Sequence, residues 1–113
     1  MKATVLLATL IAPLPLWAQN MECLFTTECY EQEACQDTAF PVFMDIDGKV
    51  MQTQFGDLTI VAVKEDDGLT ALFATGDGAE YLSVVTEGGA RLNVQMHDGP
   101  QSVTYMGACS AAE

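Results

Sequence analysis

Short runs of apolar residues, separated by turn dipeptides, fill the chain from Phe40 to Cys109. Asp-Gly and Gly-Gly pairs suit tight hairpin turns, which require positive φ angles that glycine adopts without steric cost. The pairs recur about every ten residues, a spacing typical of short antiparallel strands, and therefore predict an all-β meander. They fall at Asp47-Gly48, Gly56-Asp57, Asp67-Gly68, Asp77-Gly78, Gly88-Gly89 and Asp98-Gly99.

Alternation within the runs predicts which residues face the core. The clearest case is residues 90–97, where Ala90, Leu92, Val94 and Met96 alternate with Arg91, Asn93, Gln95 and His97. Successive side chains of a strand point to opposite faces, so the apolar set is predicted to be buried and the polar set exposed. Residues 60–63, Ile-Val-Ala-Val, are apolar on both faces and predict the most buried strand.

Seven strands are predicted between Phe40 and Cys109, with an eighth if residues 23–29 also pair. Eight antiparallel strands can close a small barrel whose interior is just filled by side chains. We therefore predict a small antiparallel barrel of seven to eight strands, with a β-sandwich as the alternative. Five large side chains are expected to fill it, namely Phe40, Met44, Phe55, Phe73 and Tyr105.

The first eighteen residues have the layout of a secretory signal peptide. Lys2 precedes the apolar residues 3–12, and a proline-containing stretch ends at the small residue Ala18. Roughly ten apolar residues are too few to span a bilayer. The sequence thus predicts a signal peptide over 1–18 and one exported domain over 19–113, periplasmic or secreted and without a membrane anchor.

Four cysteines occur, at positions 23, 29, 35 and 109, all after the predicted cleavage site. An even number of cysteines in a short exported chain indicates disulfides. Their spacing lacks the paired C-x₂-C arrangement and histidine partners of zinc sites. The acidic turns at 45–48 and 65–68 lack the ligand spacing of an EF-hand loop. No metal and no cofactor is expected.

The chain is strongly acidic, with a net charge of −12 that becomes −13 once Lys2 is removed. Such a surface repels nucleic acid and anionic membranes, and it attracts basic partners. The single histidine, His97, falls on a polar strand face, and no serine lies in a nucleophile elbow. A non-catalytic protein is therefore expected.

Two short motifs resemble the periplasmic inhibitors of C-type lysozyme. Residues 74–81, A-T-G-D-G-A-E-Y, are similar to the S-G-S-G-A-x-Y loop of that family. Residues 105–109, Y-M-G-A-C, are similar to its Tyr-x-Gly-Cys tail, with one extra residue. The resemblance covers residues 74–109 and implies an exported eight-stranded barrel whose loop enters the lysozyme cleft. The family's second inhibitory element is a lysine in a following loop, and here no lysine follows Lys64.

The binding residues that this resemblance implies are Thr75, Gly76, Asp77, Gly78 and Tyr81. In the family, a cysteine of the first strand also pairs with one in the tail. Barrel closure favours the same pairing, because it brings the first and last strands together. We therefore expect Cys23–Cys109 and Cys29–Cys35, with the other two connectivities left open.

The sequence supports three functional hypotheses. The first is a monomeric binding protein for a basic protein partner, with a C-type lysozyme as the specific candidate. The second is a small-ligand carrier with a pocket inside the barrel. The third is a structural, envelope-associated domain without a discrete ligand.

Overall fold

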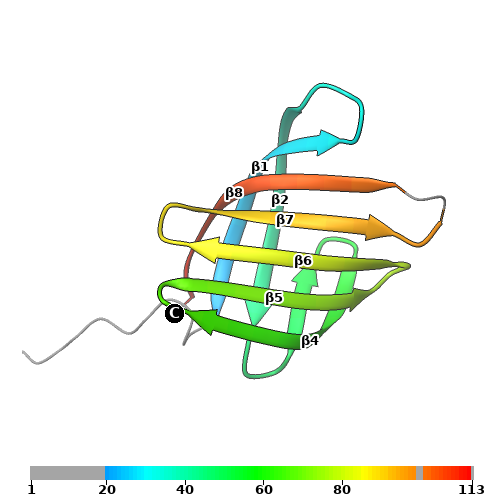
Figure 1. Ribbon diagram of the computed structural model, residues 1–113. Helices are drawn as coiled ribbons and strands as arrows, with labels where there is room; N and C mark the ends of the chain where they lie inside the picture. The colour runs from blue at the N-terminus through cyan, green and yellow to red at the C-terminus, as the bar shows by residue number, and fades with distance from the viewer. Residues whose placement is uncertain (1–19, 99–100, 113) are drawn as a thin grey trace, which may run out of the picture.

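The computed structural model describes residues 20–98 and 101–112, and its regular structure is entirely β-strand. Each strand pairs antiparallel with the next, and the last pairs with the first, so the sheet closes into a barrel (Figure 1). The predicted barrel is confirmed. The predicted signal peptide lies outside the described residues. The strands are β1 (Met21–Tyr30), β2 (Gln36–Asp45), β3 (Val50–Thr53), β4 (Gly56–Asp66), β5 (Leu69–Gly76), β6 (Ala79–Thr86), β7 (Gly89–Met96) and β8 (Ser102–Ala111).

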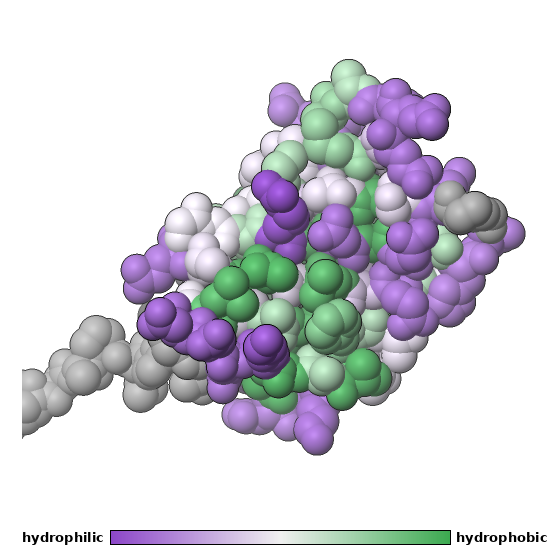
Figure 2. Space-filling view, viewed as in Figure 1, coloured by the Kyte–Doolittle hydropathy of each residue, from purple (hydrophilic) through white to green (hydrophobic). Residues whose placement is uncertain are grey.

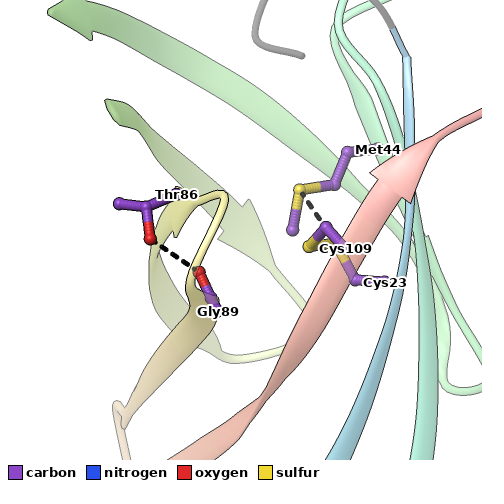
Figure 3. The surroundings of a disulfide bond; sticks show 5 residues. All are labelled: Cys23, Met44, Thr86, Gly89 and Cys109. Carbon is purple, nitrogen blue, oxygen red and sulfur yellow. Dashed lines mark hydrogen bonds between the residues drawn. A yellow bond between two sulfur atoms is a disulfide. The ribbon is translucent and has the colours of Figure 1, made fainter. Parts of the chain in front are cut away.

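Two disulfides fix the first strand, and both match the expected connectivity. Cys23 of β1 lies directly opposite Cys109 of β8 and is bonded to it, which links the two strands that close the barrel (Figure 3). The sulfur of Met44 packs 3.9 Å from the sulfur of Cys23 on the inner side of this bond. Cys29 is bonded to Cys35 and holds the base of the β1–β2 connection. No cysteine among the described residues is free.

The pairing of β1 with β8 depends on a glycine. The register of β1 shifts between Phe25 and Thr27, so the strand bulges at this point. A Cβ atom placed on Gly107 would overlap the carbonyl oxygen of Leu24 and lie 2.6 Å from the Cα atom of Phe25. Only a residue without a side chain allows the two backbones to approach this closely.

The inward faces of the strands fill the barrel. Leu92 and Val94 of β7 are buried and Met96 is partly buried, whereas Arg91 and Asn93 are exposed, which confirms the predicted phase of this strand. The described residues contain no helix that could cross a membrane. The largest fully buried apolar side chains are Phe25, Met21, Met44, Met51, Leu72 and Leu92.

The prediction that residues 60–63 form the most buried strand is wrong. Ile60 is buried, but Val61 is 62% exposed and Val63 is exposed as well. Two features account for this: β3 has four residues and pairs only with residues 56–59 of β4, and the register of β4 against β5 shifts between Ile60 and Ala62. Within residues 20–98 and 101–112, no strand pairs with this edge of β4 beyond Thr59, and Figure 1 shows β4 at the lower edge of the front layer.

Two of the five side chains expected in the interior also lie outside it. Phe55 is 62% exposed, because the turn between β3 and β4 is formed by Gln54 and Phe55 rather than by Gly56 and Asp57. Phe73 is 47% exposed and points outward from β5, opposite Leu82. Apolar side chains gather over β4, β5 and β6 on the face shown in Figure 2.

Truncation of a core residue of β7 should destabilise the barrel far more than truncation of an outward residue of the same strand. Leu92→Ala is expected to lower the free energy of unfolding by about 2–5 kcal/mol, through lost burial and a residual cavity. Arg91→Ala should change it by less than about 0.5 kcal/mol. Urea denaturation measures both values, and equal losses would contradict the assigned phase.

The two disulfides should contribute unequally to stability. In the loop-entropy account, the Cys23–Cys109 bond, with a sequence separation of 86, contributes about 4–5 kcal/mol. The Cys29–Cys35 bond, with a separation of 6, contributes about 2 kcal/mol. Denaturation of the two double-alanine variants tests this ranking. A larger loss for the variant without Cys29 and Cys35 would reverse it.

Candidate functional site

Three turns gather at one end of the barrel, which we call the mouth: the β3–β4 turn with Phe55, the β5–β6 turn with Asp77 and Gly78, and the start of the β7–β8 connection at His97 (Figure 1). The backbone N–H of His97 donates a hydrogen bond of 3.0 Å to the carbonyl oxygen of Gly78, which ties the third element to the second. The β1–β2 connection, residues 31–35, lies at the same end beside the β7–β8 connection, where the hydroxyl of Ser102 donates a hydrogen bond to Glu31. The β2–β3, β4–β5 and β6–β7 turns lie at the opposite end.

The β5–β6 turn has the two-residue geometry that its sequence predicts. Gly76 pairs with Ala79, and the two residues between them both have positive φ angles, 54° at Asp77 and 73° at Gly78. This combination defines a type I′ turn, which matches the right-handed twist of the flanking strands. Gly76 has a φ of 148°, and a Cβ atom placed on it would lie 3.0 Å from a methyl carbon of Leu58. The backbone at the base of the hairpin is therefore fixed by the φ angle of Gly76 and by its close approach to Leu58.

A polar cluster lies beside this hairpin on the outer wall. The hydroxyl of Thr75 donates a hydrogen bond of 3.0 Å to Oε2 of Glu80, and Nε2 of His97 donates one of 2.7 Å to the same oxygen. The bond from His97 is the main cause of the lowered pKa of Glu80, and the bond from Thr75 is the second. Both His97 and Glu80 are more than half exposed.

Inside the mouth, behind the hairpin, lies a cavity of about 230 Å³. It opens between the β3–β4 and β5–β6 turns and is lined mainly by aromatic and apolar side chains, with one carboxylate at its edge. No lysine or arginine of the described residues lines it. The main lining residues are Phe40, Phe55, Tyr81, Tyr105, Met96 and Asp77.

The aromatic rings around the cavity contact one another. The ring of Phe40 lies 4.7 Å from that of Tyr105 and 5.7 Å from that of Phe55, measured between centroids. Phe25 supports this group from the interior, 6.5 Å from Phe40 and 6.3 Å from Tyr105. These separations fall within the favourable range for aromatic pairs, so the wall is a packed unit.

Both tyrosines of the cavity lie in a negative environment. The pKa of Tyr105 is raised, first by burial and then by its hydrogen bond and charge interaction with Glu28. The pKa of Tyr81 is also raised, first by burial and then by the charge of Asp77. A raised phenol pKa means that a second negative charge is disfavoured at that place. Burial disfavours a charge of either sign, whereas the carboxylates of Glu28 and Asp77 favour a cation over an anion.

The five predicted binding residues lie in different parts of the mouth. Thr75 belongs to the polar cluster on the outer wall, whereas Gly76 and Gly78 shape the turn. Asp77 and Tyr81 line the mouth cavity. Sequence reasoning thus found the hairpin but not the cavity behind it.

The sequence pattern predicts Phe40, Phe55 and Tyr105 in the interior and does not identify them as residues of the mouth. The position of Phe55 directly before Gly56 was the available signal, because it places a large aromatic residue in a turn rather than in a strand. The hydroxyl of Thr53 accepts a hydrogen bond of 3.0 Å from the N–H of Phe55 and donates one of 3.0 Å to the carbonyl oxygen of Gly56. These bonds hold the turn that presents the ring.

Across residues 20–98 and 101–112, no three histidine, cysteine, aspartate or glutamate side chains come together in a way that could hold a metal ion. Comparisons of the chain with protein-family models, with curated proteins and with solved structures give no match.

The two glycines of the β5–β6 hairpin should differ in their sensitivity to substitution. Gly78→Ala meets no atom within 4 Å and is strained only by its positive φ, so a loss of about 1 kcal/mol is expected. Gly76→Ala also meets Leu58 and should cost about 2–3 kcal/mol. Thermal or urea unfolding of both variants measures the difference. Equal losses would mean that the contact with Leu58 relaxes freely.

Proposed function

We propose that this protein is an exported, non-catalytic binding domain that captures a basic protein partner at the mouth of the barrel. The observation that carries the proposal is the position of Asp77, exposed on a rigid hairpin beside an open aromatic cavity. The chain that presents it has a net charge of −12. A carboxylate next to exposed aromatic surface suits a partner that offers cationic and apolar groups together.

Charge and aromatic surface act on this partner at different stages. The acidic chain attracts a basic protein over a distance of about 8–10 Å at physiological salt, which raises the rate of encounter. At contact, the aromatic surface of the mouth supplies the burial that makes an interface specific. Binding should therefore weaken with added salt without disappearing.

Two observations support a non-catalytic role. The side chain of His97 is paired with Glu80 on the outer wall and does not line the mouth cavity. The four cysteines are all bonded in disulfides and supply no nucleophile.

A C-type lysozyme is the specific partner that we propose. The support is the resemblance of residues 74–81 to the loop of the lysozyme inhibitors, together with the exposed position of Asp77 and Gly78 at the tip of a tight hairpin. C-type lysozymes are strongly basic, which fits the charge of this chain. Thr75 or Asp77 would occupy the place of the family's inhibitory serine, and the hydroxyl of Thr75 donates a hydrogen bond to Glu80.

A small-ligand carrier is the second candidate, and the mouth cavity is the site it would use. Its volume of about 230 Å³ is below the roughly 300–1,000 Å³ of drug-sized ligand sites. The interior beneath it is filled by Phe25 and other buried side chains. The cavity thus fits a side chain of a partner better than a whole ligand molecule.

The proposal predicts that Asp77 contributes more to binding than an equivalent aspartate elsewhere. Asp67 is the matched control, because Asp67 and Gly68 form a turn with the same signs of φ at the other end of the barrel. Asp77→Asn and Asp67→Asn change the net charge equally. We expect Asp77→Asn to weaken binding to a basic lysozyme several-fold and Asp67→Asn to leave it nearly unchanged.

Calorimetric titration at low and high salt measures binding, and the clearing of lysozyme-treated cell walls measures inhibition. Equal effects of the two variants would mean that the partner does not dock at the mouth. No binding at tens of micromolar protein in low salt would rule out the lysozyme.

A further inference from the structure

We propose that the mouth cavity is a recognition site for a guanidinium group, such as the side chain of an arginine in a partner protein. The inference rests on the proposed function, because it names the group that a basic partner would insert. It concerns the cavity alone, however, and small probes can test it without any protein partner.

The shape of the cavity favours a flat group. Three of its rings are in mutual contact, Phe55 with Phe40 and Phe40 with Tyr105, and they present a continuous aromatic wall. The guanidinium of arginine is planar and stacks on aromatic faces, whereas an ammonium is a compact, strongly hydrated point charge. Aromatic faces carry the negative part of the ring quadrupole, so they attract a cation within about 6 Å.

The size of the cavity agrees with one side-chain head group. A volume of about 230 Å³ leaves room for a guanidinium and part of its aliphatic stem, but it is small for a complete organic ligand. The stem would lie against Met96 and Val94, which complete the apolar lining. A long side chain that enters from a partner's surface meets both requirements.

The charges around the cavity favour the same occupant. Asp77 lies at its edge, and Glu28 acts on the hydroxyl of Tyr105. The lysine and arginine residues of the described chain are Lys49, Lys64 and Arg91, and none of them lines the cavity. A carboxylate can receive two parallel hydrogen bonds from a guanidinium, which adds orientation to attraction.

The turn that contains Phe55 presents its ring beside the cavity. A phenylalanine that is 62% exposed in a tight turn contributes little to the core. It is nevertheless held in place by the two hydrogen bonds of Thr53 and by its contact with Phe40. An occupant of the cavity would cover this ring and complete its burial.

The direct test is titration of the protein with N-acetyl-arginine amide, followed by proton NMR of the aromatic side chains. The control probe is N-acetyl-citrulline amide, which has nearly the same shape but a neutral urea in place of the guanidinium. We expect saturable shifts of the Phe40, Phe55 and Tyr105 ring signals with the arginine probe. The citrulline probe should bind about tenfold more weakly.

Matched variants locate the site. Phe55→Leu should weaken binding of the arginine probe about five- to tenfold, whereas Phe73→Leu should leave it unchanged. Both phenylalanines are exposed, so neither variant should unfold the barrel. Asp77→Asn should also weaken binding, and Asp67→Asn should not. A nitrogen–proton correlation spectrum checks that each variant keeps the fold.

The outcomes separate this inference from the proposed function. Equal binding of the two probes, or equal effects of Phe55→Leu and Phe73→Leu, would overturn the guanidinium site even if a basic protein still binds. Specific binding of the arginine probe would support the site even if no lysozyme binds, and in that case it is the proposed partner that fails.

Discussion

The pairing of β1 with β8 is the constraint on which the rest of this structure depends. An open sheet of eight strands would have two long free edges, whereas closure leaves the short exposed segment of β4. Closure also builds the mouth, because it brings β8 with Tyr105 beside β1 with Phe25, which already pairs with β2 and Phe40. Phe40 and Tyr105 are far apart in sequence, yet their rings lie 4.7 Å apart. Gly107 and the Cys23–Cys109 bond therefore serve the site as well as the fold.

Local chemistry allowed much of the fold to be predicted. Asp77-Gly78 specifies its turn because both residues accept positive φ, and the alternation around Leu92 specifies the phase of β7. The rest depended on which strand lies beside which. Val61 looks buried by composition, but β3 ends before it can cover that part of β4. Glu80 reaches His97 only because β6 and β7 pair in one particular register. A single sequence contains no direct signal for such register.

The mouth combines rigidity with exposed apolar surface. Positive φ angles fix the β5–β6 hairpin, and the hydroxyl of Thr53 fixes the turn that contains Phe55. The aromatic rings of the cavity wall pack against one another. A partner of the kind proposed would meet a preformed surface, so little conformational entropy would be lost on binding. The polar cluster of Thr75, Glu80 and His97 serves the same end from outside, because it fastens β5, β6 and the end of β7 together beside the hairpin.

The bond between Cys23 and Cys109 has a topological consequence. The two residues are 86 positions apart, and the segment between them contains six complete strands, β2 to β7. Disulfide and backbone together form a covalent ring with the sequence termini outside it. A protease that cuts one exposed turn, such as the one at Asp67, opens the ring but releases no fragment. The nicked chain stays in one piece with its strands in place, and two cuts are needed before any strand can leave.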